Sequence, residues 1–289
     1  MLPVSVFSVD LEDYFHVEAF ADVIDRARWS EYPCRVEAST LRILDLLDRH
    51  SVKATFFILG WVAERYPQLI REIIARGHEP ACHSYWHRLI YRLTPDEFRE
   101  DTMLAKTVIE QAGGVAVRGY RAPSYSITRK SLWALDILAE CGFAYDSSIF
   151  PISHDVYGIP DAPRTPFSTV TSMGSIVEYP ITTFRLAGKR NWPVGGGGYL
   201  RIFPTQYTRM GIQRASAQGI PLIVYIHPWE IDSEQPKLPG RFTSRLRHYT
   251  NLTKMYERVD ALLASQRFGS FQDIFAPEQM QAIDGFSQQ

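Results

Sequence analysis

Short hydrophobic runs alternate with segments of helical periodicity through most of the chain. The runs have the length of strands, and they cover residues 4–10, 54–59, 119–121, 144–146, 176–179 and 222–226. Among them, leucine and isoleucine recur at helical spacing in residues 41–47 and 69–74. A chain that alternates about seven strands with helices is expected to fold as a parallel α/β barrel.

Helix boundaries and long loops refine this pattern. Thr94-Pro95-Asp96-Glu97 combines an N-cap, a proline at the first helical position and a capping-box glutamate, and it predicts the start of a helix. A second helix is predicted over residues 129–141, with Gly142 as its C-cap. The stretches 151–169 and 191–198, the second with four consecutive glycines, predict long loops, which are often functional.

The last part of the chain has a different pattern. After Pro236 the sequence becomes basic and helix-forming, most clearly over residues 241–267. We therefore predict a barrel over residues 1–235 and a helical extension over residues 236–289 that packs on its outside.

The composition restricts the kinds of partner that the protein can have. The 289 residues carry a formal net charge of −1, so no broad basic field is available for nucleic acid or an acidic membrane. No segment approaches the ~20 apolar residues that cross a bilayer, and the first residues are typical of a strand rather than a signal peptide. Cys34, Cys82 and Cys141 lack the paired spacing of zinc sites or disulfides. We expect a cytoplasmic protein with reduced thiols; the composition does not indicate an oligomeric state.

Five ionisable residues share one kind of position in the predicted barrel. Each lies at or just beyond the C-terminal end of a candidate strand, and they are Asp10, His83, Arg121, Asp146 and His227. In a parallel barrel those strand ends form one rim, which carries the active site in enzymes of this architecture. We therefore expect these residues to converge on one site.

His83 and His87 are spaced to bind one cation. If His83-Ser84-Tyr85-Trp86-His87 forms a helical turn, both imidazoles lie on one face. A divalent metal also requires an anionic ligand, and Asp10-Leu11-Glu12-Asp13 brings three carboxylates to the end of the first strand. The residue pattern indicates a metal site without deciding which carboxylate completes it.

Two other segments supply groups for hydrolysis. Arg121 can pair with Asp10 and hold it ionised, and the turn Pro123–Tyr125 can aim a backbone N–H at a developing oxyanion. His227 ends a buried strand and can act as a general acid near neutral pH. Trp229 can line a sugar groove, although an aromatic residue in this place is equally expected to pack in the core.

Taken in order, these segments resemble the five motifs of the polysaccharide deacetylase family, which is carbohydrate esterase family 4 with the NodB homology domain. The family's usual Thr-Phe-Asp-Asp-Gly opening is replaced here by Ser8-Val9-Asp10-Leu11-Glu12-Asp13, and Tyr14-Phe15-His16 follows. This variant looks like the branch found beside exopolysaccharide and PEP-CTERM export loci, as do the segments 145–151 and 196–201. The resemblance covers nearly the whole chain.

The resemblance implies a distorted (β/α)7 barrel with its active site at the C-terminal rim of the strands. It also implies a metal-dependent hydrolase that removes N-acetyl groups from the amino sugars of a polysaccharide, in exopolysaccharide biosynthesis. The implied cofactor is a divalent metal, Zn²⁺ in the first place and Co²⁺, Ni²⁺ or Mn²⁺ otherwise. The implied partner is a polysaccharide or oligosaccharide substrate.

The same resemblance gives roles to five residues. Asp10 corresponds to the base that activates a water held at the metal, and Arg121 corresponds to the residue that orients this base. His83 and His87 correspond to the metal-binding pair. His227 corresponds to the acid that protonates the leaving amine.

Three further correspondences are looser. The backbone near Tyr125 would stabilise the oxyanion, and Asp146 would tune His227, although the motif of Asp146 is the least alike. The changed first motif leaves the third metal ligand open. It is Glu12 if the extra residue of this branch forms a bulge, and Asp13 if it does not.

Two other functions are compatible with this sequence. Allantoinase-like cyclic-amide hydrolases share the fold family and some act without metal, so zinc or cobalt dependence separates them from a deacetylase. A non-catalytic sugar-binding relative would require a broken first or last motif, whereas Asp10, His83, His87 and His227 are all present.

Overall fold

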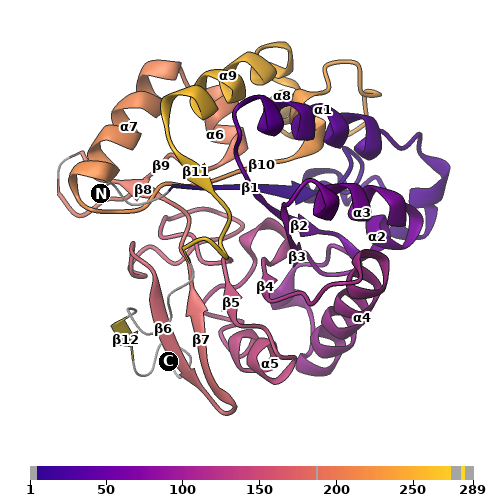
Figure 1. Cartoon of the computed structure of the whole chain (residues 1–289), viewed down its shortest axis with the longest axis horizontal. Coiled ribbons are helices and arrows are strands. Elements are labelled where there is room, and N and C mark those ends of the chain that lie inside the picture. The colour runs from indigo at the N-terminus through magenta and orange to yellow at the C-terminus, as the bar shows by residue number, and fades with distance from the viewer. Residues whose placement is uncertain (1–4, 187, 275–280, 284–289) are drawn as a thin grey trace.

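Seven parallel strands form the centre of the protein (Figure 1). The computed structural model describes residues 5–186, 188–274 and 281–283. The order of the strands in the sheet is β10, β1, β2, β3, β4, β5 and β7. Their bounds are β10 Ile223–Ile226, β1 Ser5–Leu11, β2 Thr55–Ile58, β3 Glu79–Cys82, β4 Gly119–Tyr120, β5 Tyr145–Asp146 and β7 Gly174–Glu178. The predicted parallel α/β architecture is confirmed.

The burial of the strands explains which of them the hydrophobic pattern revealed. β1, β2 and β10 are buried at every position, and β2 and β10 are almost wholly apolar, as strands covered on both faces are. β3 reads Glu-Pro-Ala-Cys, so it carries neither a hydrophobic run nor an alternating pattern, and the sequence gives it no signal.

The sheet is not closed into a full barrel by strand pairing. β6 (Phe167–Thr171) pairs antiparallel with β7, and β12 (Gln281–Ile283) pairs with β6. Within the described residues no ladder joins this end to β10. The space between is crossed by backbone bonds: Gly195 donates to the carbonyl of Thr182, and Tyr225 donates to the carbonyl of Gly195. This arrangement is compatible with a distorted seven-stranded barrel.

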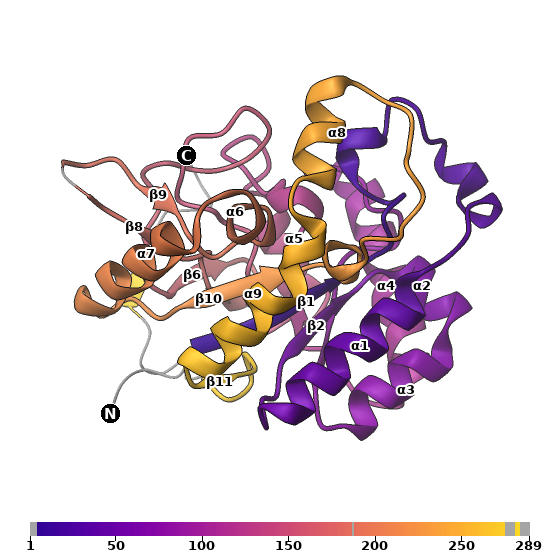
Figure 2. The same cartoon turned by 90° about the horizontal axis from the view of Figure 1, so that it is seen from above.

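Helices surround the sheet (Figures 1 and 2). They are α1 Val36–Arg49, α2 Gly60–Arg65, α3 Pro67–Ala75, α4 Pro95–Gly113, α5 Ala134–Glu140, α6 Gly197–Ile202 and α7 Thr205–Ala217. The predicted capping box of α4 is present: Thr94 Oγ1 accepts from the backbone N–H of Glu97, and the Glu97 carboxylate accepts from the backbone N–H of Thr94. β8 (Thr183–Phe184) and β9 (Trp192–Pro193) form a short antiparallel hairpin, of which β9 falls in the predicted loop 191–198.

The predicted helix over 129–141 is shorter than expected. α5 begins at Ala134 because the preceding residues form side-chain to backbone bonds instead of a helical turn. Ser131 Oγ accepts from the backbone of Thr128 at 3.0 Å and donates to the carbonyl of Ser126 at 3.0 Å. Such local bonds compete with helix formation.

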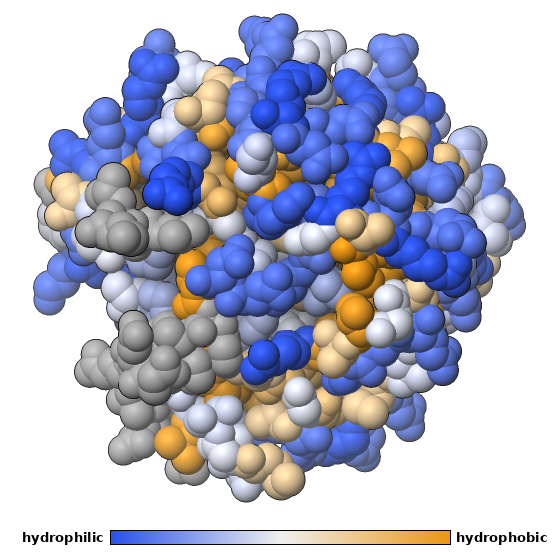
Figure 3. All heavy atoms as spheres, viewed as in Figure 1, coloured by the Kyte–Doolittle hydropathy of each residue, from blue (hydrophilic) through white to orange (hydrophobic). Residues whose placement is uncertain are grey.

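The C-terminal part contains two helices and two short strands. α8 (Phe242–Tyr249) and α9 (Leu252–Ser265) follow one another at the outside (Figure 2), and β11 (Phe268–Gly269) then pairs in parallel with β1. The tail thus contains the expected helices and also extends the sheet. The division into domains at residue 235 stays a prediction. Figure 3 shows that the face seen in Figure 1 is mostly hydrophilic, with hydrophobic side chains in separate small patches.

Candidate active site

The C-terminal strand ends bring the predicted side chains together. β1 contains Asp10 and is followed by Glu12, while His83, Arg121 and His227 directly follow β3, β4 and β10. The Nε2 atom of His227 lies 3.9 Å from Asp10 Oδ2 and 3.6 Å from Glu12 Oε1. The site is therefore built from segments more than 200 residues apart in the sequence.

Glu12, His83 and His87 form a buried cluster with one ligand atom from each. These atoms all lie within 4.8 Å of one another. His83 Nδ1 lies 2.8 Å from the carbonyl of Arg121, which leaves its Nε2 for the cluster, an arrangement common among metal-binding histidines. Burial lowers the pKa of His83 to about 4, so its ring is neutral, as metal binding requires.

The two histidines meet through an irregular turn and not through the helical turn that their spacing suggested. Ser84 and His87 have positive φ angles of 62° and 50°. Ser84 Oγ accepts a hydrogen bond from the backbone N–H of His87 at 3.0 Å, which fixes the turn. Non-glycine residues rarely adopt this conformation, and such strain is often found at functional sites.

The cluster has the chemistry of a metal site. The buried Oε2 of Glu12 has no hydrogen-bond partner in the described part of the chain, although His87 Nε2 lies 2.8 Å away. Burial alone would raise the pKa of Glu12, but the neighbouring His87 holds this pKa below its ordinary range. An ionised carboxylate and two imidazoles facing one point fit a divalent cation with an open coordination position.

Asp13 is used elsewhere. Its carboxylate accepts hydrogen bonds from the backbone N–H groups of Tyr14, Arg35 and Val36, at 2.9, 2.6 and 2.8 Å. It thereby holds the start of α1, where unpaired N–H groups and the helix dipole favour an anion. Of the two carboxylates that the sequence left open, Glu12 is the one beside the histidines.

Asp10 and Arg121 form a buried ion pair. The Nη1 atom of Arg121 lies 2.6 Å from Asp10 Oδ1 and 2.8 Å from Ser8 Oγ. Arg121 is fully buried, donates to the side chain of Ser147 and lies 3.9 Å above the ring of Phe57. Such a pairing fixes the orientation of the Asp10 carboxylate.

His227 has an acidic partner that the sequence interpretation missed. Its Nδ1 lies 3.1 Å from Glu230 Oε2, and Arg201 donates to the other oxygen of Glu230 at 3.2 Å. Burial alone would lower the pKa of His227, but Glu230 and the nearby carboxylates of Glu12 and Asp10 raise it to about 9. The available signal was the segment His227-Pro-Trp-Glu230, a capping box at the start of a 3-10 helix.

The prediction that Asp146 tunes His227 is therefore corrected. Asp146 is fully buried, but its carboxylate accepts from the side chain of Ser148 at 2.6 Å and lies beside Glu178. Asp146 supports the loop after β5. Glu230 holds the position beside His227 that the resemblance assigned to Asp146. Glu230 comes three residues after His227 in the sequence, within one 3-10 turn, so its carboxylate can reach the imidazole.

Two residues predicted to contact substrate have other contacts. Trp229 is only 6% exposed, stacks between His227 and His248, and donates through Nε1 to Glu12 Oε1 at 3.2 Å. It contacts Glu12 and packs in the core, which is one of the two roles expected for it. The backbone N–H of Tyr125 already donates to the carbonyl of Ala122 at 3.1 Å.

The turn at Pro123 still has an unusual backbone. Ser124 and Tyr125 have positive φ angles of 51° and 53°. The Tyr125 ring lies 5.6 Å from the Arg121 guanidinium, so the turn sits against the ion pair. The predicted oxyanion role of this turn remains a prediction.

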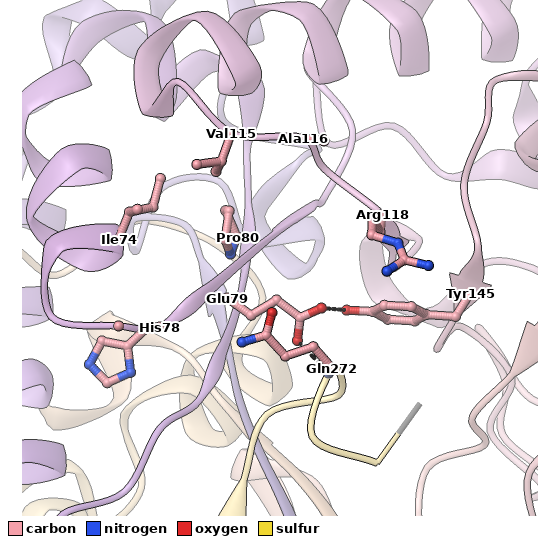
Figure 4. A pocket seen from close by; sticks show the side chains of 10 residues that line it. Ile74, His78, Glu79, Pro80, Val115, Ala116, Arg118, Tyr145 and Gln272 are labelled. Atoms are coloured by element: carbon pink, nitrogen blue, oxygen red, sulfur yellow. Dashed lines mark hydrogen bonds between the residues drawn. The ribbon is translucent and has the colours of Figure 1, made fainter. Parts of the chain in front are cut away.

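A pocket lies at the other end of the strands (Figure 4). It has a volume of about 420 Å³, and Glu79 lies in it, at the start of β3. Glu79 accepts from Thr55, from Tyr145 and from the backbone of Gln272, and these bonds fasten the C-terminal segment beneath the sheet. Its carboxylate is fully engaged, so we assign this pocket a structural role.

Comparison with known families agrees with the site. Residues 30–145 match the family described as polysaccharide deacetylase, and residues 147–276 match a domain of unknown function, DUF3473. Residues 30–145 are thus similar to the polysaccharide deacetylase family, and DUF3473 follows them along the chain. His227, Glu230 and Arg201 fall within DUF3473, so both matched regions contribute to the site.

Curated relatives share part of this chain. It is 35% identical over 98 residues to peptidoglycan-N-acetylglucosamine deacetylase from Bacillus cereus, and 39% identical over 98 residues to chitooligosaccharide deacetylase from Bradyrhizobium sp.. Each alignment covers 34% of this chain, and 36% and 42% of the respective relatives. The chain thus spans less than half the length of these relatives.

Solved structures extend the likeness to the whole fold. A Mycobacterium smegmatis protein assigned to the polysaccharide deacetylases has a TM-score of 0.58 at 22% identity, covering 93% of this chain and 89% of its own. A family 4 carbohydrate esterase from Streptomyces lividans has a TM-score of 0.51 at 17% identity, covering 97% of both chains. At these identities the likeness establishes the fold. Among the described residues, no helix is both long and apolar enough to cross a bilayer.

Proposed function

We propose that this protein is a metal-dependent hydrolase that removes acetyl groups from N-acetylated amino sugars of a glycan. The observation that carries the proposal is the cluster of Glu12, His83 and His87 beside two positioned ionisable groups, Asp10 and His227. An amide is a poor electrophile with a poor leaving group, so its hydrolysis needs water activation, carbonyl polarisation and a proton donor.

The side chains divide these tasks between them. A divalent metal held by Glu12, His83 and His87 would supply Lewis acidity for the attacking water and the amide carbonyl. Asp10 accepts the proton of the water: Arg121 engages its Oδ1, and its Oδ2 faces His227. His227, protonated through its pairing with Glu230, donates a proton to the leaving amine.

We propose Zn²⁺ as the metal. Two histidines and one carboxylate are a recurrent ligand set of catalytic zinc sites. The same donors accept Co²⁺, Ni²⁺ and Mn²⁺, so the ligand set alone does not select one of them.

The substrate class follows from the named relatives. They are deacetylases of peptidoglycan and chitooligosaccharide, whose acetyl groups are carried by N-acetylglucosamine or similar amino sugars. The first-motif variant adds a role in exopolysaccharide biosynthesis to this proposal, and that part rests on the sequence resemblance alone.

Acetate release tests the proposal. Wild-type protein, protein stripped by a chelator, protein reloaded with Zn²⁺ and the variant Asp10→Asn are incubated with chitohexaose. We expect release by the wild-type and reloaded proteins only. Full activity of the stripped protein or of Asp10→Asn would contradict the mechanism, and inactivity of all four would favour a cyclic-amide hydrolase or a non-catalytic relative.

A further inference from the structure

A second cavity lies on the active-site side of the protein, wholly within the DUF3473 region. It has a volume of about 280 Å³, close to the lower end of the about 300–1,000 Å³ of small-molecule pockets. It is enclosed by the loop after β5, the β8–β9 hairpin and the segment from α6 to α7. This size suits one sugar ring.

Aromatic rings form one wall of this cavity. Tyr199 and Phe203 are stacked with an interplanar angle of 7°, and Phe203 and Tyr207 lie 4.5 Å apart. Trp192 adds a fourth ring, and all four are only partly buried. Flat apolar faces with polar edges suit a pyranose ring, which has an apolar face and equatorial hydroxyl groups.

The cavity is held open by a buried polar residue. Asn191 is 8% exposed, and its Nδ2 donates to the carbonyl of Pro151 at 2.8 Å and to that of Pro160 at 3.2 Å. Its Oδ1 accepts from Arg185 at 2.8 Å. These bonds tie the hairpin to the loop after β5, so the two walls keep their separation without a ligand.

Neighbouring rings connect this cavity to the active site. The hydroxyl groups of Tyr199 and Tyr157 lie 2.9 Å apart, and the Tyr157 ring lies 6.0 Å from the Tyr125 ring. Tyr125 in turn lies against Arg121. The cavity and the metal cluster are therefore joined by a continuous set of packed side chains.

Two basic side chains line the cavity. Lys189 and Arg190 are exposed, and neither forms an ion pair within the described part of the chain. The Arg190 guanidinium lies 4.6 Å from the centre of the Trp192 ring, which presents the charge and the aromatic face together. Unpaired cations beside an aromatic wall favour a sugar that carries a negative charge.

We infer that this cavity binds a carboxylate-bearing pyranose of the same glycan chain whose N-acetylated unit occupies the active site. That an N-acetylated unit occupies the active site rests on the proposed function. That the cavity binds an anionic sugar rests on the residues that line the cavity. DUF3473 would then supply both the proton donor and a subsite for an acidic sugar.

Binding of two hexasaccharides tests this inference. Calorimetric titration, with a chelator present to prevent turnover, compares a hyaluronan hexasaccharide, which alternates glucuronate with N-acetylglucosamine, with neutral chitohexaose. We expect the wild-type protein to bind the hyaluronan fragment at least fivefold more tightly. Arg190→Gln should remove this difference, and Trp192→Ala should weaken both affinities at least fivefold. Lys254→Gln, which removes an exposed charge on α9, is the matched control and should change neither affinity.

The outcomes separate the two proposals. Wild-type affinities that are equal for the two sugars, or a difference that persists in Arg190→Gln, would overturn the assignment to an acidic sugar. Unchanged affinities in a folded Trp192→Ala variant would overturn the sugar site itself. Failure of the proposed function appears instead as absence of acetate release from chitohexaose by wild-type protein, whatever the binding data show.

Discussion

The Nδ1 atom of His227 lies 3.1 Å from the Oε2 atom of Glu230, a carboxylate that the fold buries completely. This pairing holds the imidazole in one orientation, with its other nitrogen toward Asp10 and Glu12. Glu230→Gln should lower kcat by about 10- to 100-fold because the proton donor loses its charged partner. KM and metal content should change less than twofold. Initial rates on chitohexaose measure kcat and KM separately. An unchanged kcat would show that Glu230 does not contribute to proton donation.

One glycine in the run of four lies against the carboxylate of Glu230. A Cβ atom on Gly197 would collide with the carboxylate of Glu230, whereas a Cβ on Gly198 would meet nothing within 4 Å. Gly197→Ala should therefore displace Glu230 and lower kcat as Glu230→Gln does. Gly198→Ala, one residue later in the same helix, should keep wild-type activity. Equal activity of the two variants would show that Glu230 is not held by this contact.

Trp229 is expected to act on the metal through Glu12. Trp229→Phe keeps the ring between His227 and His248 but removes the Nε1–H that donates to Glu12 at 3.2 Å. Loss of such a supporting bond typically costs about 10- to 100-fold in metal affinity. Competition with a chromophoric chelator measures this affinity. Trp133→Phe, on the distant start of α5, is the control, and the same affinity in both variants would contradict the role of Trp229.

The buried carboxyl pair of Asp146 and Glu178 predicts a pH dependence of stability. Burial raises the pKa of Asp146 to about 6, and burial together with Asp146 raises the pKa of Glu178 well above its ordinary value. The folded chain therefore keeps protons that the unfolded chain releases. Its free energy of unfolding falls as the pH rises from the ordinary carboxyl pKa of about 4 through 6 and beyond.

Glu178→Gln tests this dependence because it replaces one carboxyl by a neutral group of the same shape. The stability of the variant relative to wild type should rise by about 1 kcal/mol or more between pH 5 and pH 8. Urea unfolding at both pH values measures the difference. Glu257→Gln, at an exposed position of α9, should show no such rise, and a pH-independent difference for Glu178→Gln would mean that the pair does not retain its protons.

The hydrophobic pattern predicted the parts of the site that depend on strand ends. Asp10 lies near the end of the buried strand β1 and His227 follows the buried apolar strand β10, so their positions at the rim could be inferred from the hydrophobic runs and the topology. β3 could not be found in this way, since Glu79 and Pro80 give it the composition of a loop. His83 was placed by its pairing with His87 and by its motif.

The sequence could not show in which direction individual side chains of the site point. Glu12 and Asp13 are neighbours with the same charge, and only the course of the chain after β1 turns one toward His87 and the other toward the start of α1. Glu230 was missed for the same reason, because its contact with His227 depends on a 3-10 turn after β10. Such choices are made by tertiary packing.

Metal content of two matched variants tests the central proposal most directly. Glu12→Gln and Asp13→Asn each replace one carboxylate by its amide, and each protein is reloaded with Zn²⁺, dialysed and analysed for bound metal. We expect about one ion per chain in wild type and in Asp13→Asn, with Asp13→Asn less stable by about 0.5–2 kcal/mol because the start of α1 loses its anion. Glu12→Gln should retain less than about a tenth of the metal. A metal-free Asp13→Asn beside a fully loaded Glu12→Gln would contradict the proposed metal site.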